Sequence, residues 1–239
     1  MRALTHADFL SLWEEGRELH PLDQGLLAIH AAFPEARETV ADWPLGQRNR
    51  ALAELHCSYF GNALEGWTSC PQCGEKLEFN MDGRALAEQP ESHHAEPVVI
   101  HGQTFRLPTS RDLARAVHER DAAADPDAAA VRLLRACRVG GGDDAEQTWS
   151  EEELEEAGEK MAAADPLAEI VLNFQCPVCE ATCHESLDLP TFLWAELEAL
   201  ARRLVMDVHA LASAYGWRER EILALSDTRR RLYLEMVSA

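Results

Sequence analysis

Apolar side chains recur at helical spacing along the segment that follows Pro190. They are separated by steps of 4, 3, 4, 4, 3 and 4 residues, which averages close to the helical repeat of about 3.6 residues. The pattern predicts one long helix with a single buried face, ended by Gly216. Two shorter helices should follow, the second capped by Ser226. The stripe consists of Leu193, Leu197, Leu200, Leu204, Val208, Leu211 and Tyr215.

Shorter helical patterns occupy the first part of the chain. Thr5 can cap the first of these helices, and Pro21 suits the first turn of the second. A third pattern covers residues 48–60, just before Gly61. We therefore expect an N-terminal helical region over residues 1–66 and a C-terminal helical region over residues 190–239.

Between these regions, several short segments have the polar and apolar pattern of strands. Residues 76–80 alternate, and residues 170–175 form a short apolar run that is predicted to pair with residues 182–189. Residues 98–100 and 104–107 are predicted to form a further hairpin, followed by helices over residues 110–120 and 125–138. The fold class indicated is α+β and mostly helical, with short β-hairpins flanked by N- and C-terminal helices.

Two pairs of cysteines adjoin the predicted hairpins. Two residues separate Cys70 from Cys73, and two separate Cys176 from Cys179. This spacing lets both thiolates of a pair bind one ion, and four thiolates make the closed tetrahedral site that is typical of structural zinc. We therefore expect one Zn²⁺ per chain, in a split zinc ribbon. Its two halves would be residues 67–82 and 170–189, with residues 83–169 as an insertion of hairpin, helices and an acidic section.

Other uses of the cysteines are weaker interpretations. A redox Cys-Pro-X-Cys pair opens a helix after a strand, which neither pair does here. A catalytic zinc ion needs an open coordination position, which four thiolates do not leave. Cys183 or His184 could replace one ligand, although a packing role on the return strand is favoured. The two remaining cysteines, Cys57 and Cys137, are expected to be small buried residues on helices.

The net charge excludes several classes of partner. The 239 residues include 42 acidic and 22 basic side chains, which gives a formal net charge of −20. Nucleic-acid backbones and anionic membranes attract clustered Lys and Arg, so neither is an expected partner. The sequence shows neither an apolar signal segment nor an apolar run of membrane-spanning length. A cytoplasmic location is therefore expected.

Half of the net charge falls in one segment. Residues 141–170 contain 11 acidic residues and one lysine, a net charge of −10. Within this segment, Ser150 and Glu153 make a capping box for a helix. We expect a solvated helix on a mobile surface insertion, and the alternative is a docking patch for a basic partner.

Motifs for catalysis or nucleic-acid recognition are weak or absent. The sequence has no phosphate-binding loop, dinucleotide fingerprint or nucleophile elbow, so nothing in it supports an enzyme. The arginines between residues 218 and 231 lie in a helix-turn-helix outline, but neighbouring acids nearly cancel their charge. A packing or protein-docking element is favoured there over DNA reading. The pair His93-His94 lies in a polar stretch and is expected to be solvated.

Several motifs together resemble one family. They are the Leu45-Gly46-Gln47-Arg48 stretch, the two Cys-Pro-X-Cys pairs, Phe192-Leu193-Trp194-Ala195-Glu196-Leu197, Tyr215-Gly216-Trp217 and Glu221-Ile222-Leu223-Ala224-Leu225-Ser226. The sequence is similar to the T-even-phage-type baseplate protein family, also called baseplate hub assembly chaperones. Homologues of this family accompany contractile tails and extracellular contractile injection systems. Residues 83–170 match no pattern of the family.

The resemblance implies a non-enzymatic factor that either helps to assemble the hub or baseplate or stays within it. Its expected partners are baseplate, hub or spike proteins, and the factor could be incorporated into an injection particle. The alternative is a zinc-ribbon protein that binds nucleic acid or acts as a regulator. An enzyme, in the form of a thiol-dependent reductase, ranks third.

Overall fold

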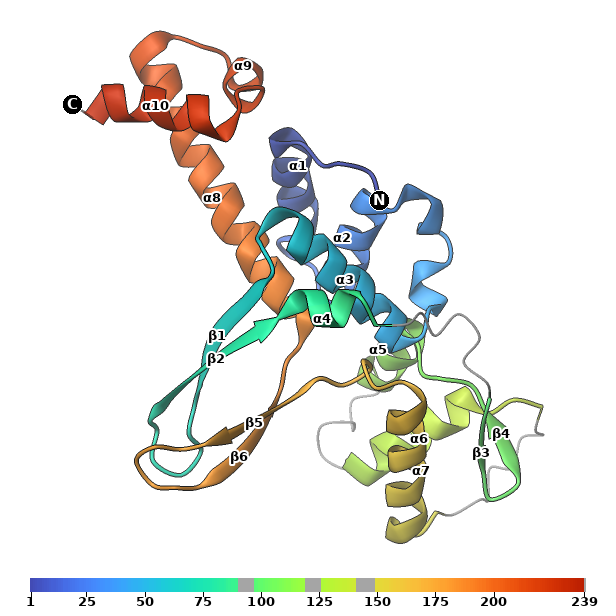
Figure 1. The fold of residues 1–239 in the computed structure, drawn as a ribbon. Helices are drawn as coiled ribbons and strands as arrows, with labels where there is room; N and C mark the ends of the chain where they lie inside the picture. Colours follow the sequence, from blue (N-terminus) through green and yellow to red (C-terminus); the bar gives the residue numbers. More distant parts are fainter. Residues whose placement is uncertain (90–96, 119–125, 141–148, 239) are drawn as a thin grey trace. The chain divides into compact units, whose positions relative to one another are not determined.

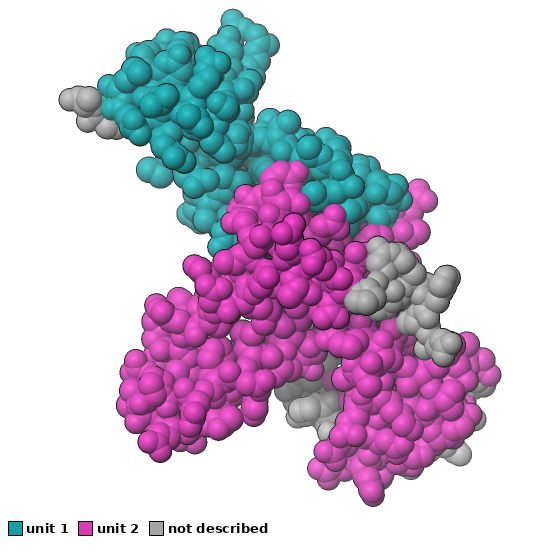
Figure 2. Space-filling model, in the orientation of Figure 1, with its two compact units in different colours: residues 1–37, 190–239 teal, residues 38–189 magenta. Residues whose placement is uncertain are grey.

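The computed structural model describes residues 1–89, 97–118, 126–140 and 149–238. Within these ranges it contains helices and three two-stranded antiparallel sheets (Figure 1), so the predicted mixture of helices with short hairpins is confirmed. None of the helices in these ranges is both long enough and apolar enough to cross a membrane. The chain divides into two compact units (Figure 2), residues 1–37 with 190–239 and residues 38–189. The predicted N-terminal region over residues 1–66 is thus shared between both units.

The first unit is helical. Its core forms where Leu10 of α1, Leu204 of α8 and Leu223 of α9 pack together. The predicted start of α1 is confirmed, because Thr5 and Asp8 form a capping box, and Pro21 begins α2. The elements are α1 (His6–Gly16), α2 (Pro21–Ala32), the short 3₁₀ helix η1 (Pro34–Ala36), α8 (Leu189–Tyr215), α9 (Glu219–Leu223) and α10 (Asp227–Ser238).

The long helix α8 buries most of the predicted stripe. Leu197, Leu204 and Leu211 are at most 1% exposed, whereas Tyr215 at the helix end is 40% exposed. Gly216 follows with φ of +69°, a left-handed backbone conformation that glycine adopts without strain. Beyond this turn, Trp217 stacks on Tyr215 and also contacts Tyr233 of α10, with ring centroids 4.8 Å apart in both pairs.

The second unit contains all the strands in the described part of the chain. Each strand pairs with its neighbour in sequence, β1 with β2, β3 with β4 and β5 with β6. The elements are η2 (Val40–Asp42), α3 (Leu45–Tyr59), β1 (Ala63–Ser69), β2 (Lys76–Asp82), α4 (Gly83–Ala87), β3 (Val98–Ile100), β4 (Gln103–Phe105), α5 (Ser110–His118), α6 (Pro126–Cys137), α7 (Glu151–Ala164), β5 (Val171–Gln175) and β6 (Thr182–Ser186).

Some boundaries differ from those expected from the sequence. The helix α3 begins at Leu45 instead of residue 48, because the extended backbone of Pro44 marks its start. The first cysteine-bearing hairpin begins at Ala63 instead of residue 67, since Ala63 pairs with Asp82 and the neighbouring Leu64 is fully buried. The short helix α4 was not expected; the side chain of Asp82 caps it. The residue proposed to cap α6, residue 125, lies outside the described residues.

The helix of the acidic section is only partly solvated. Its capping box of Ser150 and Glu153 is present as predicted. However, Ala157 of α7 is fully buried in a core cluster with Ile100 of β3 and Phe105 of β4. The expectation of a solvated helix on a mobile insertion is therefore wrong for this face of α7. The amino-acid composition did not indicate this buried face, because glutamates outnumber its apolar residues, which are Leu154, Ala157 and Met161.

Buried polar groups join the start of α3 to the segment between α7 and β5. A carboxylate oxygen of Asp165 accepts a hydrogen bond from the backbone N–H of Gly46 at 2.9 Å. The side-chain amide of Asn49 donates to the carbonyl of Leu167 at 2.7 Å. Arg48, only 5% exposed, donates to the Asn49 side chain at 2.8 Å. These bonds fix the segment that precedes β5 against the helix that precedes β1.

Candidate metal centre

The four predicted ligands lie in two turns. Cys70 and Cys73 follow β1, and Cys176 and Cys179 follow β5. The β1–β2 and β5–β6 hairpins lie side by side with these turns at the same end (Figure 1). The structure thus brings together four cysteines that the sequence separates into two distant pairs, and all four sulfurs lie within 4.8 Å of one another.

The two turns repeat the same backbone design. The N–H of Cys70 donates to the carbonyl of Glu75 at 2.8 Å, and the N–H of Cys176 donates to Ala181 at 2.9 Å. The residue after the second cysteine of each pair is left-handed, with φ of +78° at Gly74 and +59° at Glu180. Glycine accommodates this conformation freely, whereas a glutamate does so at some cost. The repeated turn therefore presents each pair of sulfurs in the same way.

The spacing of the sulfurs suits a tetrahedral site. With metal–sulfur bonds of about 2.3 Å, tetrahedral neighbours lie about 3.8 Å apart. The Cys70 and Cys179 sulfurs are 3.6 Å apart, and the Cys73 and Cys176 sulfurs are 3.5 Å apart. These distances are far longer than a disulfide bond of about 2.05 Å, and the four cysteines are free thiols. The cluster could therefore hold one metal ion.

The thiols of the cluster differ in their pKa values. Backbone N–H groups of Cys73 and Gln72 lower the pKa of the Cys70 thiol to about 7. The backbone N–H of Glu75 likewise lowers the pKa of Cys73. Burial and the neighbouring cysteine sulfurs outweigh this effect and raise the pKa of Cys73 to about 12. One thiolate is thus favoured while further ionisation beside it is opposed. A bound divalent cation would remove this opposition, because it binds the thiolate form.

The other sequence candidates take secondary positions. Cys183 packs against the cluster of Cys70, Leu77 and Cys176 from β6, in the position expected for a packing residue. The exposed side chain of His184 instead pairs with Asn173 on β5. Cys137 is fully buried as expected, whereas Cys57 is only half-buried. The pair His93-His94 lies outside the described residues.

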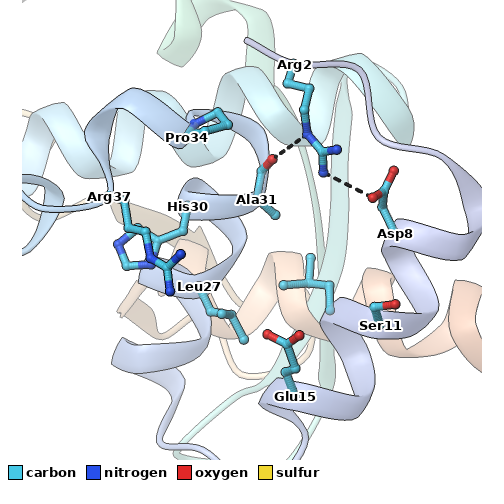
Figure 3. Close-up of a pocket in the computed structure, with 10 residues that line it drawn as sticks. Arg2, Asp8, Ser11, Glu15, Leu27, His30, Ala31, Pro34 and Arg37 are labelled. Carbon is cyan, nitrogen blue, oxygen red and sulfur yellow. Dashed lines mark hydrogen bonds and ion pairs between the residues drawn. The ribbon is translucent and has the colours of Figure 1, made fainter.

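A second candidate site lies within the first unit. A cavity of about 350 Å³ opens between α1 and α2 (Figure 3). Arg2 at its rim donates to the Asp8 carboxylate at 3.1 Å and to the carbonyl of Ala31 at 3.2 Å, so its charge is already compensated. Burial and the charge of Arg37 lower the pKa of His30. In Figure 3, Ser11 lies across the cavity from His30, so hydroxyl and imidazole do not form a nucleophile–base pair.

Sequence reasoning missed two features of the second unit. Trp67 on β1 is 62% exposed, although tryptophan side chains are on average highly buried. Asp165 and Gly46 form a buried contact that no local pattern indicates, because 119 residues separate them. The exposure of Trp67 could have been inferred from the alternation of side chains along β1, in which Trp67 and Leu64 lie on opposite faces. Because this hairpin was expected to start at residue 67, the alternation was not recognised.

The cysteine cluster is the better defined of the two sites. Its four sulfurs occupy one small volume, and their repeated turns present them inward. Four thiolates around one ion would leave no coordination position for a substrate, so the arrangement suits a structural metal. Comparisons with protein-family models, with curated proteins and with solved structures find no significant match to this chain.

Proposed function

We propose that the chain is a non-enzymatic baseplate component or baseplate-hub assembly chaperone of a phage-tail-like contractile injection system. A structural zinc ion, held by Cys70, Cys73, Cys176 and Cys179, stabilises it as a split zinc ribbon. The tetrahedral spacing of the four sulfurs carries the zinc assignment. The motifs that resemble the baseplate family carry the biological assignment.

The zinc ion acts on the fold. Binding to four thiolates contributes on the order of 10 kcal/mol in small zinc peptides. Here it joins two hairpins whose shared apolar contacts are few, chiefly Leu77 and Phe174 beside the cysteines. The metal is therefore the main connection between the ends of the hairpins.

Several residues of the motifs that resemble the baseplate family lie in the core of the fold. Arg48 and Trp194 are buried, and Ile222 is fully so. A side chain at Gly16 would collide with Trp194, since its Cβ would lie 2.2 Å from the indole. Motif residues that determine packing are expected when a family shares a fold, because a change at these positions disturbs the core.

Metal analysis tests the zinc assignment. Full-length protein purified without chelator should contain about one zinc ion per chain and lack the visible absorption of an iron–thiolate site. Removal of the zinc by a chelator should lower the unfolding temperature. Protein that is equally stable without any metal would contradict the assignment.

Co-purification tests the biological assignment. The tagged chain should be expressed together with the sheath, tube, hub and spike genes of its own gene cluster. We expect hub or baseplate proteins to be retained on the tagged chain, and deletion of its gene to prevent assembly of complete particles. Retention of none of these proteins, together with normal particles in the deletion strain, would refute the proposal. Binding to duplex DNA at moderate salt would instead favour the nucleic-acid-binding alternative.

A further inference from the structure

The β1–β2 hairpin has one exposed face. In the register of this hairpin, Trp67 lies opposite Glu78 and Glu65 lies opposite Asn80. All four residues belong to the same face. The other face carries Leu64 and Leu77, which are at most 5% exposed and point into the unit. Because side chains alternate along a strand, the residues of the exposed face are Glu65, Trp67, Ser69, Lys76, Glu78 and Asn80.

At the centre of this face, the exposed indole of Trp67 already contacts the ammonium group of Lys76. The ammonium of Lys76 lies 5.6 Å from the centroid of the Trp67 ring, within the range of a cation–π interaction. The same ammonium forms an ion pair with Glu78 at 2.8 Å. On the other side of the indole, the carboxylate of Glu65 is fixed by the Asn80 amide at 2.8 Å. The face therefore combines an aromatic ring with two positioned carboxylates.

The surface beside the indole is hollow. A cavity of about 500 Å³ is lined by this face together with Gly66 and Phe79. The Phe79 ring lies against the backbone of Gly66, where a Cβ atom would come within 2.6 Å of it. The missing side chain of Gly66 makes room for the Phe79 ring, and the cavity beside Trp67 is lined by Glu65, Lys76, Glu78 and Asn80 as well.

Charge indicates what this face would bind. Residues 63–82 contain Glu65, Glu75, Glu78 and Asp82 but only Lys76 as a base, and the whole chain has a net charge of −20. A basic side chain of a partner can take the place of Lys76 on the ring and pair with the same carboxylates. In addition, each strand of this hairpin is paired on one side only within the described residues, so an extended segment can align along it.

We infer that the outer face of the β1–β2 hairpin is the docking surface for an extended, basic segment of a partner protein, with Trp67 as its centre. The identity of that partner as a hub or baseplate protein rests on the proposed function. Tryptophan is enriched among the residues that dominate binding energy in protein interfaces, which agrees with a central position for Trp67. In the free chain, Lys76 occupies the position on the Trp67 ring that a basic side chain of the partner would take.

A peptide tests the chemistry of this surface. The probe is a dye-labelled nine-residue peptide that alternates arginine and threonine, titrated with full-length, zinc-loaded protein and followed by fluorescence anisotropy. Trp67→Ala should weaken binding at least about tenfold, and Glu78→Gln should weaken it less. Lys76→Ala should strengthen binding, because it removes the internal competitor. The control Val178→Ala changes a residue that is 64% exposed in the second turn and should leave affinity unchanged.

Folding is checked in parallel. Since Trp67 is exposed, Trp67→Ala should keep its zinc content and unfolding temperature, and Trp67→Phe should retain most of the affinity. Equal affinity of Trp67→Ala and the parent chain would overturn the inference. Weaker binding of Lys76→Ala would also overturn it, as would concentration-dependent self-association that Trp67→Ala abolishes, which would identify a second copy as the occupant.

The partner is tested separately. Co-purification of hub and baseplate proteins should be lost with Trp67→Ala and kept with Val178→Ala. If both variants retain these proteins equally, the docking inference fails while the proposed function stands. If the parent chain retains none of them but binds the peptide through Trp67, the proposed function fails while the basic-segment site stands.

Discussion

The carboxylate of Asp165 caps the start of α3 by accepting the backbone N–H of Gly46, 119 residues earlier in the chain, at 2.9 Å. Pro44, the residue at the start of α3, provides no side-chain cap of its own. The first N–H groups of a helix have no partner within it, and a carboxylate also interacts favourably with the helix dipole. Asp165 therefore replaces the missing local cap and joins two distant segments through one bond.

Substitution of Gly46 tests how closely these segments approach. A Cβ atom at residue 46 would lie 1.8 Å from an oxygen of Asp165. Gly46→Ala should therefore lower the free energy of unfolding by about 1–3 kcal/mol, in spite of the better helix propensity of alanine. Urea denaturation provides the measurement. Gly158→Ala in α7, where nothing lies within 4 Å, is the matched control and should be neutral or stabilising.

Removal of the Asp165 charge should change the dependence of stability on pH. Burial raises the pKa of Asp165, although the bond from Gly46 and the charge of Arg48 act against this shift. An acid whose pKa is raised by folding binds protons more tightly in the folded state, so its contribution to stability falls as pH rises above its unfolded pKa. Asp165→Asn keeps an acceptor for the Gly46 N–H and should flatten this part of the profile. Unfolding free energies between about pH 4 and pH 7 provide the measurement, and an unchanged slope would contradict the assignment.

The opposite behaviour is expected of Asp112. Its burial alone would raise its pKa, but hydrogen bonds from Arg106 and Thr109 outweigh burial and lower the pKa of Asp112 below 3.8. The stability from this group is complete above its unfolded pKa and is lost as pH falls through the lower folded pKa, in the range below about pH 4. Asp112→Asn should cost about 1–3 kcal/mol at neutral pH, since it weakens the hydrogen bonds that the carboxylate accepts from Arg106 and Thr109. Thermal and urea unfolding of both proteins measure this cost.

A matched pair lies close by in the same unit. Arg111 and Asp42 form a similar two-pronged ion pair, with bonds of 2.7 and 3.0 Å, but both side chains are at least half exposed. Asp42→Asn should therefore cost less than about 1 kcal/mol. Equal costs for the two substitutions would show that burial does not distinguish these pairs.

The ligand set is tested by single substitutions at cysteines. Cys73→Ser and Cys176→Ser should each abolish binding of one zinc per chain and lower the unfolding temperature, because three thiolates no longer close the site. Cys183→Ser should keep one zinc per chain, because Cys183 packs beside the cluster in a supporting position. Metal content by elemental analysis and thermal unfolding are the readouts. Loss of zinc in Cys183→Ser would identify Cys183 as a ligand.

Local patterns predicted the elements better than they predicted contacts. The leucine stripe of α8, the Thr5 cap of α1 and the capping box of α7 depend on neighbours within a few residues, and these were recognisable in the sequence. The spacing of Cys70 and Cys73, and its repetition at Cys176, likewise made the cysteine cluster foreseeable. In each case the signal lies within a short segment, although the cysteine cluster joins two such segments.

The remaining features depend on tertiary approach. Arg48 belongs to a helical pattern, where a charged residue normally faces solvent, yet it is 5% exposed because Asn49 and Ser110 receive its hydrogen bonds. The buried face of α7 exists because β3, β4 and α6 cover Ala157. Trp67 faces solvent because the register of β1 against β2 assigns Leu64 to the inside. Ser110 and the elements that cover Ala157 lie far along the chain from Arg48 and α7, so no local window contains them.

With a metal ion in the cysteine cluster, the chain becomes a closed ring of defined size. The two inner ligands, Cys73 and Cys176, enclose 102 residues between them. A protease that cuts one peptide bond within this ring would open the loop without separating the molecule, because both fragments remain attached to the same ion. After chelation, the two fragments would be joined only by non-covalent packing, such as that of Leu10 against Leu204 and Leu223 in the first unit. A bound metal would thus close this part of the backbone reversibly, in a way that depends on metal supply.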